Sequence, residues 1–199
     1  RLTPPAHTSH HMYFYNRMVT SDSSRLLYCA EINGRRNLYL MELATGDAVQ
    51  LTEGDALDDY GAMISADDKS VYYQQDRKVW KLDLATLQRT CLYAAPDGWD
   101  CGNWGMSDDN RYLVMTETRR DTLPDLTGKK GWEFFPLTCA AKPLCHIVYL
   151  DTQTGEHHIV VEDRCWFGHA QLRPGDPDTI LFCHEGPYDM IDARLWLIQ

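Results

Sequence analysis

A repeat of about 41 residues runs along the chain and constrains its fold more than any other feature. Four segments join an Asp-rich turn to an apolar run: "TSDSSRLLYCAE", "SADDKSVYYQQ", "MSDDNRYLVMTE" and "RPGDPDTILFCHE". After each of the first three comes a strand-turn-strand pattern: "LYLMELATGDAVQL", "VWKLDLATLQRTCL" and "IVYLDTQTGEHHIV". Thr45 and Thr86 occupy the same place in this pattern, 41 positions apart. Units of this length with several short strands are typical of β-propeller blades.

The same strands could also form a β-sandwich, but a sandwich has no reason to repeat its turn residues at a fixed spacing. The predicted fold class is therefore all-β, a β-propeller with about four blades in this chain. Closed propellers usually have more blades, and the last unit stops after "ARLWLIQ". We expect residues 1–199 to be the N-terminal part of a single β-propeller domain in a longer chain.

One interval of the repeat is longer than the others. Thr86 and Thr154 are 68 positions apart, so this interval holds about 27 extra residues. The extra residues form a polar segment with three Pro, at 119–143. We expect an insertion between strands that contains a short helix or acts as a lid. Long insertions between regular strands often line binding sites.

Charge and cysteine usage exclude several classes of function. The net charge is −10 and no basic tract is present, so neither a nucleic-acid partner nor an anionic membrane surface is expected. No apolar stretch reaches the ~18 residues of a membrane span. The seven Cys contain no Cys-x-x-Cys pair, which gives no signal for structural zinc and favours reduced thiols in the cytoplasm.

The candidate site residues are His and Arg side chains close to the ends of predicted strands, where propeller loops surround a central funnel. They are His10 in "HTSHHMYFYN", His169 and Arg173 in "CWFGHAQLRPGD", His184 in "FCHEGP" and Arg194 in "DARLW". No zincin motif, nucleophile elbow, P-loop or dinucleotide-binding Gly motif is present.

Each candidate also has a purely structural interpretation. A His before a strand is more often a structural residue than a catalytic one. Arg173 could serve only the turn that holds Asp176, and Arg194 could pair with Asp192 or Glu185 in a structural network.

Several of these segments together resemble the oligogalacturonate lyase family. The resemblance is carried by "RLTPP", "HHMYFYN" and "NLYLMELATGDAVQLTEG", and most strongly by "GHAQLRPGDPDTILFCHEGPYDMIDARLWL". It covers essentially the whole chain, whereas "DTLPDLTGKKGWEFF" in the insertion diverges from the family.

The resemblance implies a seven-bladed propeller that cleaves short oligogalacturonides by β-elimination in the bacterial cytoplasm, as a step in pectin degradation. It implies a divalent metal, usually Mn²⁺, held by His and Gln residues of later blades outside this chain. The presumed base is a His in those blades. By this resemblance Arg194 lies beside the scissile uronate, and His184 is a second catalytic candidate. His10, His169 and Arg173 are the substrate-binding candidates, and residues 1–199 alone are expected to be inactive.

The residue types suit this chemistry. Removal of the C5 proton of a uronate adds negative charge to a carboxylate that is already charged, so a bound cation stabilises the transition state. Arg binds a carboxylate through two parallel hydrogen bonds, and a neutral His is a suitable base near pH 7. Two alternatives stay open: a WD40- or TolB-like scaffold without catalysis, and a hydrolase that uses Glu185 and Asp189 as its carboxylate pair.

Overall fold

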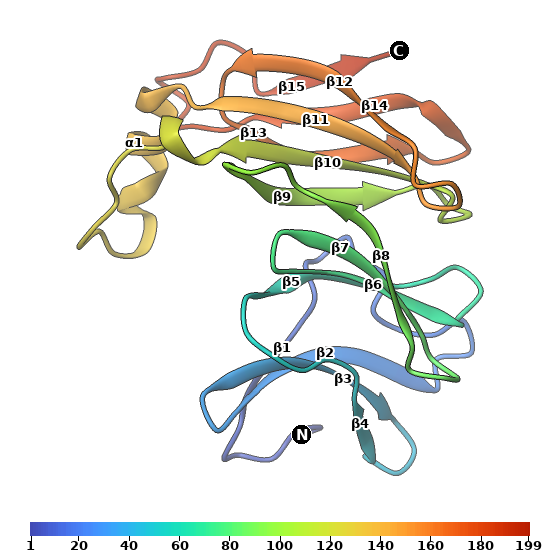
Figure 1. Ribbon diagram of the computed structural model, residues 1–199. Coiled ribbons are helices and arrows are strands. Elements are labelled where there is room, and N and C mark those ends of the chain that lie inside the picture. Colours follow the sequence, from blue (N-terminus) through green and yellow to red (C-terminus); the bar gives the residue numbers. More distant parts are fainter. The chain divides into compact units, whose positions relative to one another are not determined.

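The computed structural model describes residues 1–199 and divides into two compact units, Arg1–Ala94 and Ala95–Gln199 (Figure 1). The strands form four antiparallel sheets, two in each unit, and each sheet is built from strands that follow one another along the chain. This is the organisation that the repeat predicts, with one sheet for each repeat unit.

The first unit holds two four-stranded sheets. In both, each strand pairs with its neighbour in the sequence. The first sheet consists of β1 (Thr8–His11), β2 (Arg25–Ile32), β3 (Arg35–Glu42) and β4 (Ala48–Gln50). The second consists of β5 (Leu57–Ile64), β6 (Ser70–Gln75), β7 (Lys78–Asp83) and β8 (Arg89–Ala94).

The second unit holds a four-stranded and a three-stranded sheet. The third sheet consists of β9 (Trp99–Met106), β10 (Tyr112–Arg119), β11 (Leu144–Asp151) and β12 (His157–Arg164). The fourth consists of β13 (Phe167–Arg173), β14 (Asp176–His184) and β15 (Leu195–Ile198).

Residues 119–143, the predicted insertion, comprise the last residue of β10 and the whole connection from β10 to β11. They contain two 3-10 turns, η1 (Arg120–Thr122) and η2 (Gly131–Glu133), and one helix, α1 (Phe134–Ala141). The backbone N–H of Lys130 donates to Oε2 of Glu133 at 2.7 Å just before the helix. The helix ends at Ala141; its C-cap Lys142 has a left-handed φ of 48°, and Pro143 follows.

Within each unit the two sheets bury apolar side chains against each other. In the first unit, Leu27 and Leu38 of the first sheet pack with Ile64 and Tyr73 of the second. The second unit has a corresponding cluster, to which Val114, Ile147, Phe167, Ala170, Ile180 and Phe182 belong. Burial of these side chains, worth about 1.5–3 kcal/mol for each large aliphatic or aromatic residue, is the main force that holds each pair of sheets together.

The Asp-rich turn of the repeat has the same hydrogen bonds in three units. A Ser or Thr hydroxyl donates to the Asp two residues later, which also accepts the backbone N–H two residues beyond itself. The three pairs are Thr20 with Asp22, Ser65 with Asp67 and Ser107 with Asp109, at 2.7, 2.6 and 2.6 Å. The residue after each Asp is left-handed, with φ of 59° at Ser23, 60° at Asp68 and 59° at Asn110. The repeated letters therefore encode a repeated turn.

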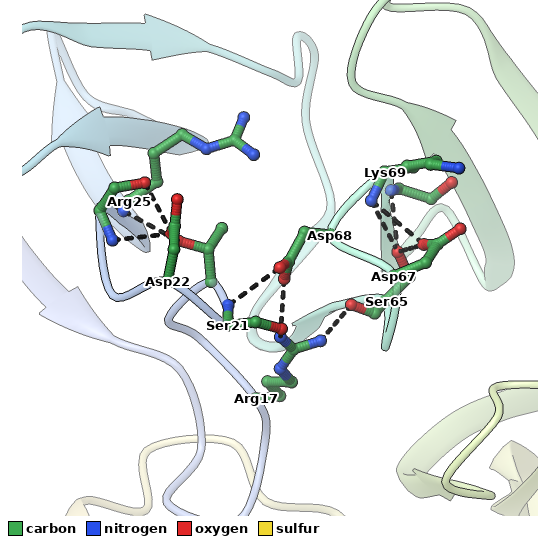
Figure 2. Close-up of polar contacts among 11 residues, drawn as sticks. Arg17, Ser21, Asp22, Arg25, Ser65, Asp67, Asp68 and Lys69 are labelled. Carbon is green, nitrogen blue, oxygen red and sulfur yellow. Dashed lines mark hydrogen bonds and ion pairs between the residues drawn. The ribbon is translucent and has the colours of Figure 1, made fainter.

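A charged contact joins two of these turns across the sheets of the first unit (Figure 2). Arg17 donates to Oδ1 of Asp68 at 2.6 Å and to the hydroxyl of Ser21 at 2.6 Å, and it also donates to the carbonyl of Ser65. The other Asp68 oxygen accepts the backbone N–H of Ser21 at 2.9 Å. One arginine thus links the two turns within this unit.

Candidate functional site

The candidate site lies in the second unit, at the end of the fourth sheet where β13 begins and β14 ends. Glu185 directly follows β14, and only 6% of its surface is exposed. Its backbone N–H donates to the carbonyl of Trp166 at 2.7 Å, which extends the pairing of the two strands. A carboxylate at this depth needs charged or polar partners in place of the water it has lost.

Arg194 is the first of these partners. Its Nη2 donates to Oε2 of Glu185 at 2.6 Å, and its Nη1 donates to the carbonyl of Gly186 at 3.1 Å. The Arg194 carbonyl accepts the backbone N–H of His184 at 2.9 Å, which fixes the main chain as well. The side chain keeps 31% of its surface exposed. Since a guanidinium has five N–H donors in a planar fork, this geometry leaves donors for an incoming anion.

His169 is the second partner. Its Nε2 lies 3.1 Å from Oε1 of Glu185, so the two Glu185 oxygens face two different basic groups. The side chain reaches this position through an irregularity in β13. The pairing with β14 shifts register between Gly168 and Gln171, and His169 itself is left-handed with a φ of 53°. Strain of this kind, of order 1–3 kcal/mol, is often found at functional sites.

Gly168 makes room for the buried carboxylate. A Cβ at this position would lie 2.6 Å from Oε1 of Glu185 and 2.7 Å from its Cγ. Any larger residue would therefore displace the Glu185 side chain. The sequence "GH" thus places a residue without a side chain against Glu185 and a basic residue beside it.

The possible metal ligands of residues 1–199 are not clustered as they usually are in divalent-metal sites. No group of three or more His, Cys, Asp or Glu side chains in residues 1–199 is arranged to hold an ion. His169 and Glu185 are two possible ligands, and Arg194 already binds the second of them. Divalent metal sites in proteins usually draw on three or more ligands of these types.

His184 does not join this cluster. Its ring stacks on Trp196 with centroids 4.4 Å apart and on Phe167 at 5.4 Å. Neighbouring residues of a strand point to opposite faces, which explains why His184 lies among aromatic rings while Glu185 meets Arg194. Burial lowers the pKa of His184 below its ordinary 6.5, although Asp163 acts in the opposite direction. The neutral imidazole is therefore favoured in the folded protein.

His10 belongs to the first unit and has partners of its own there. Its Nε2 lies 3.5 Å from Oδ2 of Asp59, and its ring stacks on Tyr60 with centroids 4.3 Å apart. The same Asp59 oxygen accepts a hydrogen bond from Arg36 at 2.8 Å. These contacts form a polar cluster between the two sheets of that unit.

Arg173 lies at the far end of β13 from His169, next to the hairpin that leads into β14. Its Nη1 is 3.8 Å from Oδ2 of Asp176, and its side chain is 64% exposed. This is the contact that the structural interpretation of Arg173 predicts. The pair is worth little on an exposed surface, about 0–1 kcal/mol.

Glu185 is the central residue of the cluster, and it is not among the five predicted site residues; the sequence offers it only as a structural partner or as a carboxylate of the hydrolase alternative. The sequence places it beside His184 and offers it as one of two possible partners for Arg194; the structure pairs it with Arg194, and Asp192 is not the partner. The available signal was a carboxylate directly after a buried strand, in a stretch that also carries basic residues. Which basic residues it would meet depends on pairing between strands, and a single sequence does not display that pairing.

Comparison with solved structures shows the class of fold. An oligogalacturonate lyase in complex with manganese superposes with a TM-score of 0.93 at 40% identity, over 100% of this chain and 52% of that one. TolB from Acinetobacter baumannii superposes with a TM-score of 0.59 at 16% identity, over 98% of this chain and 41% of that one, a likeness of fold alone. The chain itself folds into four consecutive antiparallel sheets. Together with these two likenesses, the sheets define an all-β protein of the β-propeller class, as the repeat predicted.

Comparison of sequences narrows this class to a family. The sequence profile described as oligogalacturonate lyase matches residues 1–199. The oligogalacturonate lyase of Dickeya dadantii (strain 3937) is 38% identical over 201 aligned residues, which cover 100% of this chain and 51% of that protein. The chain belongs to the oligogalacturonate lyase family. It spans about half the length of the curated relatives that it matches.

Proposed function

We propose that this chain is the part of an oligogalacturonate lyase in which Arg194 binds the uronate carboxylate at the cleavage site. The reaction is β-elimination of short oligogalacturonides, which yields unsaturated uronate products. One observation carries the proposal: Arg194 is held by Glu185 and Gly186 while about a third of its side chain stays exposed. Membership of the lyase family supports the choice of substrate and reaction.

The chemistry follows from charge. When a base removes the C5 proton, electron density moves into the neighbouring carboxylate and the bond to the O4-linked sugar breaks. A guanidinium that already contacts this carboxylate stabilises the enediolate-like transition state more than the ground state. Because Glu185 and the Gly186 carbonyl fix the guanidinium beforehand, little reorganisation is required during the reaction.

Glu185 and His169 are proposed to act through Arg194. Glu185 alone would offset the charge of Arg194, but a second basic group, His169, lies 3.1 Å from the other oxygen of the same carboxylate. The two basic groups together therefore leave this cluster able to attract an anion, although the net charge of the protein is −10. The contacts of His184, His10 and Arg173 give no comparable support for the roles that the resemblance suggests for them.

We further propose that activity requires a divalent metal, and that its ligands lie outside residues 1–199. Manganese is the metal of the related lyase complex. Such an ion would supply additional positive charge to the uronate carboxylate. On this proposal residues 1–199 alone are inactive, and the complete propeller is one domain.

A cytoplasmic location and a role in pectin degradation complete the proposal. The seven cysteines are all free thiols, which suits a reducing compartment. No helix in the structure has both the length and the hydropathy needed to cross a bilayer.

The test uses the complete protein with trigalacturonate, followed by the ultraviolet absorbance of the conjugated product. Wild type should form this product, and EDTA should abolish the reaction. Arg194→Ala should reduce kcat/KM by at least ~100-fold, and Arg194→Lys should recover only part of it because Lys lacks the planar fork. Turnover within about threefold of wild type in Arg194→Ala would remove Arg194 from the mechanism. Absence of any unsaturated product from wild type would instead favour a scaffold of the TolB type.

A further inference from the structure

The connection between β10 and β11 is the part of the second unit that the proposed function leaves without a role. Its two ends are tied together: the Thr122 hydroxyl donates to the carbonyl of Arg119 at 2.6 Å and accepts the backbone N–H of Leu144 at 3.0 Å. Figure 1 shows α1 at the end of the unit where β10 ends and β11 begins. The connection is therefore closed at its base, which limits where its helix can lie.

The first turn of α1 packs beside the segment that carries Glu185. The rings of Phe134 and Phe135 lie 6.0 and 5.3 Å from the ring of Trp166. The carbonyl of Trp166 accepts the backbone N–H of Glu185 at 2.7 Å. Edge-to-face contacts between aromatic rings favour one relative orientation. The start of the helix is thus fixed against the residue that pairs with the carboxylate of the candidate site.

A residue near the other end of α1 contacts the turn that leads to Arg194. A Cβ added to Gly186 would lie 2.4 Å from Sγ of Cys139 and 3.1 Å from its Cβ, and Cγ2 of Ile191 would be 3.0 Å away. The Cys139 side chain therefore fills the space that a side chain at position 186 would occupy. The carbonyl of the same Gly186 accepts from Nη1 of Arg194 at 3.1 Å.

These contacts connect Cys139 to the guanidinium through a single residue. Gly186 lies in the turn between β14 and β15, where no sheet pairing fixes the backbone. Packing by a neighbouring side chain can supply the missing restraint. Burial raises the pKa of the Cys139 thiol above its ordinary 9.0, so the thiol stays protonated and behaves as a small apolar group.

We propose that Cys139 is a positioning residue for the reaction: its side chain holds Gly186 where the Gly186 carbonyl fixes the guanidinium of Arg194. The insertion is then a support for the site. The inference rests on the proposed function, in which Arg194 stabilises the transition state. A guanidinium free to tilt still attracts the substrate carboxylate but loses the alignment that the transition state needs. Loss of the Cys139 contact should therefore affect kcat more than KM.

The first test measures kcat and KM of the complete protein with trigalacturonate. Cys139→Ala leaves a gap beside Gly186 and should lower kcat roughly 3- to 10-fold, with KM within about twofold of wild type. Cys139→Ser has nearly the same shape and should recover most of the loss. Cys101→Ala removes another partly buried thiol, from β9, and is the matched control. A lower thermal stability with unchanged kcat would give Cys139 a structural role only and overturn the proposal.

Combined variants separate positioning from general destabilisation. A residue that acts through Arg194 has nothing to act on in Arg194→Ala, so Cys139→Ala should change kcat there by less than about twofold. Gly186→Ala places a methyl group against Sγ and should lower kcat more than Cys139→Ala does. Cys139→Ala should then restore part of the activity of Gly186→Ala, although it is harmful alone. Independent losses in both combinations would contradict the proposal.

A measurement without substrate distinguishes this proposal from the proposed function. NMR of the guanidinium nitrogens reports how freely each group rotates, and the Arg194 signals are assigned by their absence in Arg194→Lys. Because both Nη atoms donate hydrogen bonds, rotation should be slow in wild type and Cys139→Ser and faster in Cys139→Ala. Unchanged rotation in Cys139→Ala would overturn the positioning role whether or not the protein is a lyase. Faster rotation in a protein without lyase activity would support the contact and count against the proposed function alone.

Discussion

The guanidinium of Arg194 donates to the carboxylate of Glu185 at 2.6 Å, and nothing in their sequence positions requires them to meet. They are nine positions apart, with a turn between the strands that they flank. The same carboxylate faces His169 on the neighbouring strand at 3.1 Å. Glu185 therefore decides where two basic side chains lie.

Glu185→Ala should weaken both the fold and the reaction. It leaves Arg194 without its acceptor and removes the carboxylate beside His169, at a cost of about 1–3 kcal/mol in unfolding free energy, toward the low end because Arg194 is partly exposed. Misplacement of the guanidinium should lower kcat/KM by about 10- to 100-fold. Urea unfolding and product absorbance measure the two effects. Glu185→Gln keeps an acceptor and should lie between wild type and Ala; if it matched Ala in stability, the charge would matter more than the hydrogen bond.

Gly168→Ala should destabilise the protein because the new methyl group would overlap the Glu185 side chain. Overpacking of this kind costs roughly 1–3 kcal/mol. The comparison variant is Gly46→Ala, where no atom lies within 4 Å of the new Cβ and only the φ of 80° is unfavourable. Thermal unfolding measures the stability of both variants. Product absorbance should show an additional loss of activity in Gly168→Ala only. Full activity in Gly168→Ala would mean that Glu185 can move without consequence.

The stability of the protein should fall as pH decreases through the ordinary range of histidine, in part because of His184. Burial lowers its pKa in the folded state, so the unfolded chain binds a proton at this residue more readily than the folded chain does. The resulting loss of unfolding free energy begins as pH falls through about 6.5, the ordinary pKa, and ends below the lowered value. His184→Phe should preserve the stacking on Trp196 and make the pH profile between pH 7 and 5 shallower. An unchanged profile would contradict this assignment.

Asp22 should contribute stability that is lost only in strong acid. Hydrogen bonds from the backbone and side chain of Ser24 and from the side chain of Thr20 lower its pKa to about 2, below its ordinary 3.8. The contribution is complete above the ordinary pKa and is lost as pH falls through about 2. Asp22→Asn should therefore be less stable than wild type at pH 7, and the two should converge in acid. Unfolding followed by circular dichroism over this pH range measures the difference.

Much of the fold could be predicted because its signals are local. Asp22, Asp67 and Asp109 bind donors within a few residues of themselves, so the turn chemistry is visible as repeated letters. The site could be predicted only in part. Arg194 and His169 stand out as basic residues at strand ends, but neighbouring positions such as His184 and Arg173 carry the same kind of signal. Strand alternation directs His184 among aromatic rings, and Arg173 lies at the opposite end of β13.

The sequence by itself determined the repeat, the antiparallel sheets and the family, because each depends on periodicity or on a long run of matching residues. Only the tertiary structure decided that Glu185 holds both Arg194 and His169, and that α1 packs on Gly186. These contacts join residues of different elements: a strand, the turn between β14 and β15, and a helix. Their geometry depends on register, on the irregularity at His169 and on the space left by Gly168, and these emerge only when the sheets have packed.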